Sequence, residues 1–143
     1  FNDLKNDRIL DILFDWDEIL DFEGESGPYL MYTHARLRSI MRKSGQAPLL
    51  DPTMIVDDEA LAVARHLLLF EHVIDQVVET NKPHTLARWL LDMASLINSY
   101  YQKHRVIQED KMLEQARLAL IERVADRLKL GLELLGLWAP SEM

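Results

Sequence analysis

The chain has 143 residues, of which 48% are hydrophobic and 28% are charged, and its formal net charge is −8. This composition is that of a globular protein, and the length suffices for one domain with a hydrophobic core. The absence of cysteine excludes disulfides, thiolate metal sites and cysteine nucleophiles. No apolar run reaches the ~20 residues that cross a bilayer, and no signal-peptide pattern opens the chain. The chain begins with Phe1, which indicates a fragment or a processed product.

The first segment, over residues 3–21, has apolar side chains at helical spacing and is followed by a turn at 23–25. We therefore expect a helix there. Its acidic residues fit two interpretations, a cation site or, more often for such clusters, a solvated face; they are Asp15, Asp17, Glu18 and Asp21.

The second segment carries clear start and stop signals. Gly27 interrupts the preceding segment, Pro28 suits the first position of a helix, and Gly45 follows its expected end near residue 43. Residues three and four apart share a helical face, so Tyr29, Tyr32 and Arg36 should form one ridge. Two aromatic rings beside a guanidinium suit the stacking of unpaired RNA bases. The alternative is that the tyrosines belong to the core and the arginine is solvated.

The remaining segments also predict helices. Residues 46–53 contain two prolines and predict an irregular connection, after which Asp57 or Asp58 should cap a third helix that extends to about residue 80 and breaks near 69–70. Pro83 should begin the next helix. Its apolar positions form a stripe with steps of 4, 3 and 4 residues: Leu86, Leu90, Met93 and Ile97.

A polar stretch over 103–110 precedes a last long helix, which Gly131 and Gly136 should end. Its inward positions are expected to be Leu113, Ala116, Leu120, Val124 and Leu128. No segment alternates with a period of two, so strands are not expected. The predicted fold class is all-α, a bundle of about five or six helices.

Basic residues gather in two parts of this acidic chain. Residues 26–50 hold four basic and no acidic side chains, and residues 81–108 hold four basic side chains and one acidic. Such islands indicate either a local surface for an anionic ligand or chance clustering on a solvated face.

Catalytic signatures are missing from the sequence. It contains no phosphate-binding glycine loop, no G-x-G-x-x-G turn, no H-E-x-x-H and no G-x-S-x-G. No two of the five histidines pair at a spacing of four residues. His34 and His84, in the first turns of helices, are expected to cap or to make core hydrogen bonds. The chain alone is therefore expected to be inactive as an enzyme.

Three separated motifs resemble one family. The first runs from Phe14-Asp15-Trp16-Asp17 through Asp21-Phe22-Glu23-Gly24 into GPYLMYTHARLRS, the second is PHTLARWLLDMA followed by NSYY, and the third is GLELLG followed by APSEM. In this order they resemble the C-terminal anticodon-binding (DALR-type) domain of arginyl-tRNA synthetases, over almost the whole chain.

This resemblance implies a parent class I aminoacyl-tRNA synthetase that ligates arginine to its tRNA with ATP in the cytoplasm. The parent's nucleotide-binding motifs are absent here, so no catalytic residue, no metal site and no cofactor is assigned to this chain; ATP belongs to the parent. Residues 1–24 would be a linker helix from the catalytic domain, and residues 25–143 the helical anticodon-binding domain. The implied partners are the anticodon loop of tRNA(Arg) and the parent's catalytic domain, with no DNA and no membrane.

The same resemblance implies the binding residues. The ridge of Tyr29, Tyr32 and Arg36 would face the anticodon loop, and Tyr101 and the terminal Met143 would help to form a base pocket. Arg105 lies one turn beyond Tyr101 and departs from the aromatic residue that some relatives place there. Arg38, Arg42 and Lys103 would add phosphate contacts with Arg36.

A non-catalytic protein-interaction module is the alternative, since amphipathic helices with an acidic surface also suit partner docking. The position of the three tyrosines discriminates between the two functions: burial of all three would favour docking.

Overall fold

The computed structural model describes residues 1–7, 15–22 and 24–143. These residues form six α-helices and one short 3-10 helix, η1 (Pro52–Met54), and they contain no strand. The helices are α1 (Trp16–Leu20), α2 (Gly27–Ser44), α3 (Asp58–Leu68), α4 (Phe70–Thr80), α5 (His84–Lys103) and α6 (Lys111–Leu134). The predicted all-α class is confirmed.

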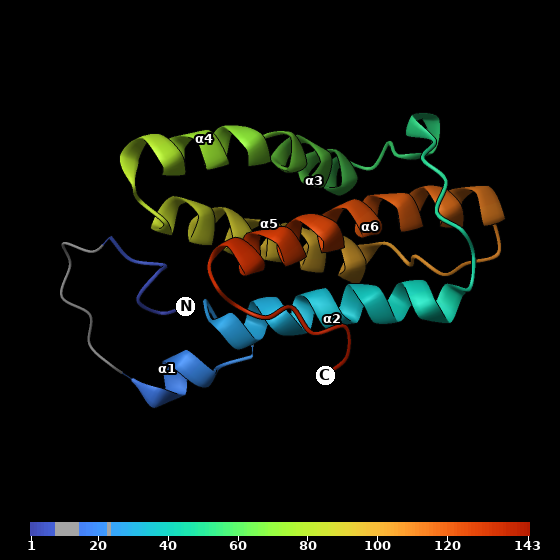
Figure 1. Ribbon diagram of the computed structural model, residues 1–143. Helices are drawn as coiled ribbons and strands as arrows, with labels where there is room; N and C mark the ends of the chain where they lie inside the picture. The colour runs from blue at the N-terminus through green and yellow to red at the C-terminus, as the bar shows by residue number, and fades with distance from the viewer. Residues whose placement is uncertain (8–14, 23) are drawn as a thin grey trace.

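The long helices lie roughly side by side in layers, as Figure 1 shows. Helices α3 and α4 follow one another along one side, α5 and α6 occupy the middle, and α2 covers the opposite side. Helix α2 packs on both α6 and α5, whereas α3 and α4 pack mainly on α5. The C-terminal residues 137–143, which we call the tail, turn back from the end of α6 and lie across α2 (Figure 1).

Local signals predicted α2 to within a residue of each end. The Ser26 hydroxyl accepts a hydrogen bond from the Tyr29 N–H at the start, and Pro28 occupies the first turn. Gly45 ends the helix in the left-handed conformation at φ 64°, which glycine adopts without a steric penalty. The predicted break at 69–70 is also confirmed, because α3 ends at Leu68 and α4 begins at Phe70.

The N-terminal prediction is wrong in part. Residues 2–6 form turns rather than a helix, and α1 begins only at Trp16, where the Asp15 carboxylate accepts from the Asp17 N–H. Residues 8–14 lie outside the described residues. The Lys5 ammonium donates to the Glu25 carbonyl at 2.9 Å, which ties the first few residues to the chain just before α2.

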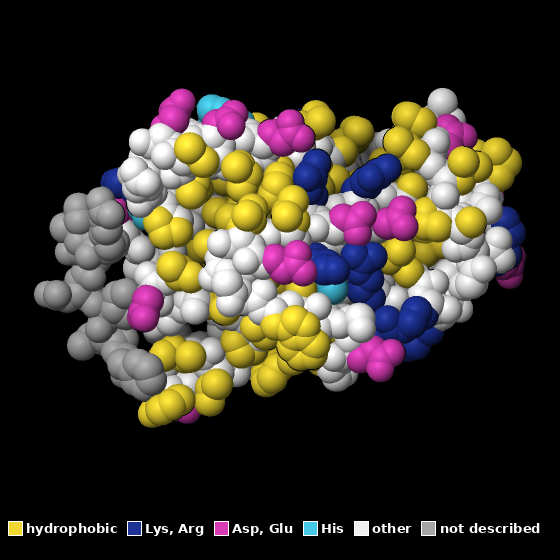
Figure 2. All heavy atoms as spheres, viewed as in Figure 1, with side chains coloured by type: hydrophobic (Ala, Val, Ile, Leu, Met, Phe, Trp, Pro, Cys, Tyr) yellow, Lys and Arg dark blue, Asp and Glu magenta, His cyan; other side chains and the backbone are white. Residues whose placement is uncertain are grey.

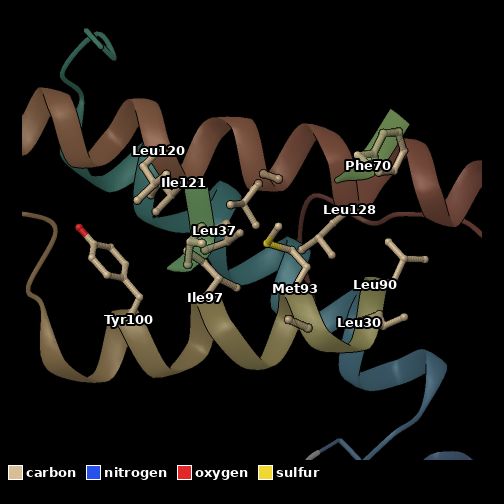
Figure 3. Close-up of a cluster of buried hydrophobic side chains, with 14 of the residues drawn as sticks. Leu30, Leu37, Phe70, Leu90, Met93, Ile97, Tyr100, Leu120, Ile121 and Leu128 are labelled. Carbon is tan, nitrogen blue, oxygen red and sulfur yellow. The ribbon is translucent and has the colours of Figure 1, made fainter. Parts of the chain in front are cut away.

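The core lies where α5 meets α2 and α6. The predicted stripe of α5 is buried throughout, and Figure 3 shows Leu90, Met93, Ile97 and Tyr100 pointing between the flanking helices. The inward positions that we predicted for α6 are buried as well, except that Leu113 is only partly covered.

Gly131 has a different role from the predicted one. Helix α6 continues through it to Leu134, and Gly136, at φ 75°, follows the helix end. A Cβ on Gly131 would lie 2.6 Å from Leu90 Cδ2, so this position lacks a side chain because α5 and α6 approach closely there. The prediction that Gly131 ends α6 is therefore wrong: the glycine serves helix packing.

Candidate functional site

An open hollow of about 490 Å³ lies where α2, α5 and the tail meet. We call it the main hollow; its walls include Tyr32, Arg36, Arg42, Lys43, Tyr101 and Met143. In Figure 2, Lys and Arg side chains gather over α2 and between α2 and α6, next to a few acidic side chains. The hollow therefore combines aromatic, aliphatic and cationic groups at the surface, and Glu142 adds one carboxylate.

Arg36 joins two aromatic rings of the main hollow. Its guanidinium carbon lies 4.6 Å from the centroid of the Tyr32 ring and 5.8 Å from that of Tyr101, both within cation–π range. Arg36 Nη2 also donates to the Tyr32 hydroxyl at 3.0 Å. Both tyrosines keep 38% of their surface exposed. The rings are thus held in place while their faces remain open to a ligand.

Tyr100 and Tyr101 separate as neighbours on a helix should. Tyr100 is fully buried and stacks on His104, with ring centroids 5.0 Å apart. Burial raises the pKa of its hydroxyl to about 12. Of the two, only Tyr101 lines the main hollow.

His34 fixes the tail against α2. Its Nδ1 lies 2.7 Å from the Pro140 carbonyl oxygen, and Arg38 Nε donates to its Nε2 at 3.3 Å. A carbonyl oxygen can only accept, so Nδ1 carries a proton, and Nε2 accepts from Arg38 and therefore carries none. The ring is thus neutral. Burial is the main cause that lowers the pKa of His34, and the charges of Arg38 and Lys129 act in the same direction.

Arg42 holds the last residues. Its Nη1 and Nη2 both donate to the Ser141 carbonyl at 3.1 Å, and Nη2 lies 3.4 Å from the Glu142 carboxylate. Met143 then follows in the wall of the main hollow with 62% of its surface exposed. The two anchors, His34 and Arg42, therefore determine where the terminal thioether lies.

Two of the predicted site residues lie outside the main hollow. Tyr29 belongs to the same ridge of α2, but its hydroxyl accepts from Asn98 Nδ2 at 3.0 Å and it lines a neighbouring hollow. Arg105 lines another hollow with residues 107–111. Helix α5 ends at Lys103 and His104 is extended, so Arg105 does not continue the helical face of Tyr101.

Salt bridges occupy most of the second basic island. Lys82 pairs with Asp7, Arg88 with Glu25, and Lys103 with Glu59 at 2.6 Å. The salt bridge between Arg38 and Asp126, at 2.7 Å, removes one cation from the first island as well. Arg42 pairs with Glu142 as well, so Arg36 and Lys43 are the cations of the first island that line the main hollow without a salt bridge to another described residue.

Within the described residues, no group of three or more His, Cys, Asp or Glu side chains could hold a metal ion. The acidic residues around α1 that the structure describes thus form no such group. No helix of the described part is long and apolar enough to cross a membrane.

Sequence reasoning missed the anchoring of the tail. The available signal was the four-residue spacing of His34, Arg38 and Arg42, which places them along one side of α2. Asn98 was also missed as a site residue. It donates to Tyr29 and to the Thr33 hydroxyl, at 3.0 and 3.1 Å, and so joins α5 to α2 beside the rings.

The chain is similar to one family of proteins by sequence and by structure. The family model for the DALR anticodon binding domain matches residues 30–143. An arginine–tRNA ligase of Alkaliphilus metalliredigens is 39% identical over the whole chain, and one from an Exiguobacterium species is 45% identical. The chain spans about a quarter of the length of these relatives, 26% and 25% respectively.

Solved structures agree with the sequence comparison. Arginyl-tRNA synthetase from Thermus thermophilus superposes with a TM-score of 0.84 at 38% identity, over 91% of this chain and 23% of that one. Arginyl-tRNA synthetase from Plasmodium falciparum superposes with a TM-score of 0.88 at 26% identity, over 99% of this chain and 25% of that one.

Proposed function

The chain belongs to the DALR anticodon-binding domain family of arginyl-tRNA synthetases, and from this premise we propose that its main hollow binds unpaired anticodon bases of tRNA(Arg). One observation carries the proposal: Arg36 holds the half-exposed rings of Tyr32 and Tyr101 around an open hollow. Anticodon bases are unpaired and can splay outward, and each base stacked on an aromatic ring contributes about 1–3 kcal/mol.

The other groups of the main hollow suit the backbone and the base edge. Lys43 would meet phosphates, so binding should weaken as the salt concentration rises. Met143 would supply a soft apolar wall. Tyr29 would contact a base from its neighbouring hollow, and Arg105, which is exposed, would contact the RNA backbone outside the main hollow.

The rest of the parent protein follows from the relatives. We propose that residues 1–24 connect to a catalytic domain that joins arginine to tRNA(Arg) with ATP, in the cytoplasm, and that residues 25–143 form the anticodon-binding domain. No residue of this chain takes a catalytic role in that reaction.

The alternative of a protein-interaction module has less support. Burial of all three tyrosines would have favoured it, whereas Tyr32 and Tyr101 are exposed. The hollow beside them is lined by three basic side chains and one acidic one. The main hollow is therefore better suited to bind an anionic ligand with flat rings than to bind the apolar face of a peptide.

The test is the affinity of the 143-residue chain for an anticodon stem-loop of an arginine tRNA. Tyr101→Ala should weaken binding about 5- to 150-fold, because it removes one stack of about 1–3 kcal/mol. Tyr101→Phe is the matched control, since it keeps the ring and should keep most of the affinity. Equal affinities for the wild type and Tyr101→Ala would contradict the proposal.

A further inference from the structure

Met143 differs from most of the six methionines of the chain in its exposure. It keeps 62% of its surface exposed, whereas Met93 in the core is fully buried. Met112, in the first turn of α6, is exposed to nearly the same extent, at 59%. The other three are half-buried: Met31, Met41 and Met54. An oxidant in solution therefore reaches the thioethers of Met112 and Met143 more easily than those of the other four.

Hydrogen peroxide converts an exposed methionine into its sulfoxide. The sulfur donates an electron pair to one peroxide oxygen, the O–O bond breaks, and the other oxygen leaves as water with both hydrogens. The thioether loses two electrons and the peroxide gains them. A flexible apolar side chain thereby becomes a polar one, whose new oxygen accepts hydrogen bonds.

One of the two exposed methionines belongs to the main hollow. Met143 lines it together with the rings of Tyr32 and Tyr101, and the described residues that line this hollow include no second methionine. Met112 lies at the start of α6, outside this lining. The two thioethers are thus matched in exposure but differ in whether they face the proposed RNA site.

The tail holds Met143 in place without using its side chain. His34 binds the Pro140 carbonyl at 2.7 Å, and Arg42 binds the Ser141 carbonyl, two residues before the end, at 3.1 Å. Neither contact involves the thioether, so oxidation of the sulfur leaves both anchors intact. The change is confined to the wall of the main hollow, where a polar sulfoxide replaces an apolar thioether.

The new oxygen opposes RNA binding in two ways. A base packed against this wall would cover an oxygen that is hydrated in the free protein, and burial of such a group without a partner is unfavourable. The oxygen also lies in the same lining as Arg36 and Lys43, whose N–H groups it can accept in place of a phosphate. Both effects act against the ligand and leave the helix core unchanged.

We propose that Met143 is a reversible oxidation site, at which peroxide lowers the affinity of the main hollow for RNA. The inference rests on the proposed function, because it takes RNA bound at the main hollow as given. The reverse step is reduction by a methionine sulfoxide reductase with a dithiol. The sulfoxide oxygen then leaves as water, the thioether is restored, and the dithiol is oxidised to a disulfide.

The first experiment treats the 143-residue chain with increasing hydrogen peroxide and removes the peroxide with catalase. Peptide mass spectrometry gives the oxidised fraction at each methionine, and the same samples are titrated with an anticodon stem-loop of an arginine tRNA. Met143 and Met112 should oxidise before the other four. Affinity should fall about 5- to 150-fold as the Met143 sulfoxide forms, the effect of one buried polar group without a partner. Reductase with dithiol should restore it.

Two leucine variants assign the loss to one sulfur. Each protein is compared with its own untreated sample, so a change in starting affinity does not matter. Met143→Leu should keep its affinity through peroxide treatment, because its side chain in the main hollow cannot be oxidised. Met112→Leu is the matched control, and peroxide should weaken its binding as much as that of the wild type. Thermal denaturation checks that every treated sample is folded.

Protection by RNA gives a measurement that is independent of the affinity loss. Bound stem-loop should slow the oxidation of Met143, because it covers the thioether, while Met112 should oxidise at the same rate with and without RNA. Equal rates for Met143 in the two conditions would overturn the inference.

The outcomes separate this inference from the proposed function. If the untreated wild type binds the stem-loop and Tyr101→Ala weakens binding, but complete oxidation of Met143 leaves the affinity unchanged, the inference fails and the proposed function stands. Loss of affinity by treated Met143→Leu, as large as that of the wild type, also overturns it. If the untreated wild type does not bind the stem-loop, both proposals fail.

Discussion

Replacement of His34 tests whether the tail depends on one neutral imidazole. His34→Ala removes the donor to the Pro140 carbonyl, and both residues are buried. An unsatisfied buried carbonyl costs about 1–3 kcal/mol, so the free energy of unfolding should fall by about that amount at neutral pH. His34→Asn is the matched variant, because its amide nitrogen takes the position of Nδ1 and can still donate; it should lose much less.

The pH dependence provides the sharper test. Burial lowers the pKa of His34 below its ordinary value of 6.5, so the unfolded chain binds a proton before the folded one as the pH falls. The wild type should therefore lose stability as the pH falls below 6.5, over a window that ends at the lowered pKa. Neither variant has this titration, and the stability difference between wild type and His34→Ala should shrink on acidification. The charges of Arg38 and Lys129 lower the pKa further, whereas the hydrogen bond to the Pro140 carbonyl and the charge of Asp126 raise it.

The assay is urea denaturation of the three proteins at a series of pH values between neutrality and about pH 5. If the free energy of unfolding changes with pH in the same way for the wild type and His34→Asn, the reasoning is refuted. The titration of His34 would then contribute nothing to the pH dependence of stability. RNA binding supplies a second measurement. His34→Ala should weaken binding at neutral pH because Met143 is no longer held in the wall of the main hollow.

Three further predictions concern other parts of the chain. Gly131→Ala should lower the free energy of unfolding by up to about 2 kcal/mol, because overpacking against Leu90 outweighs a helix-propensity gain of about 1 kcal/mol. Leu90→Ala alone should lower the free energy of unfolding by about 2–5 kcal/mol, and in the Leu90→Ala protein the added Gly131→Ala should be stabilising. If Gly131→Ala stabilises the wild type, the close approach of α5 and α6 is contradicted. Lys43→Ala should reduce the slope of log affinity against log salt by about 0.7, and an unchanged slope would remove Lys43 from the phosphate contacts. The hydrogen bond from Lys103 lowers the pKa of Glu59 to about 2, so acid should remove its stabilising contribution between about pH 4.5 and 2, and Glu59→Gln should show a flatter stability profile over that range.

The sequence was informative wherever the cause of a structure is local. Helix α2 was predicted well because a first-turn proline and a terminal glycine act within one turn of the residues they affect. The α5 stripe was predicted for the same reason, since a repeat of three and four residues is a property of the helix itself. The family resemblance is confirmed by a match over residues 30–143.

The failures have tertiary causes. Gly131 carries the sequence signal of a helix end, but its lack of a side chain serves contact with Leu90, which is 41 positions away in the chain. The contact of His34 with Pro140 spans 106 positions, and no local pattern announces it. Arg105 does not share the helical face of Tyr101, because α5 ends at Lys103, and its contact with RNA stays a prediction.

The positions of the α2 side chains explain why the tail and the rings form one site. At 100° per residue, Tyr29, Tyr32, Arg36 and Lys43 lie within about 60° of one another, whereas His34, Arg38 and Arg42 occupy a different sector. Of the three residues in the second sector, Arg42 lies at the smallest angle from the sector of the rings. The tail contacts His34 through Pro140 and Arg42 through Ser141, so it crosses α2 toward the rings and ends with Met143 in the main hollow. A change of register at the start of α2 would therefore displace the rings and the tail together. Loss of the tail anchors alone would open the main hollow and leave the neighbouring hollow that Tyr29 lines intact.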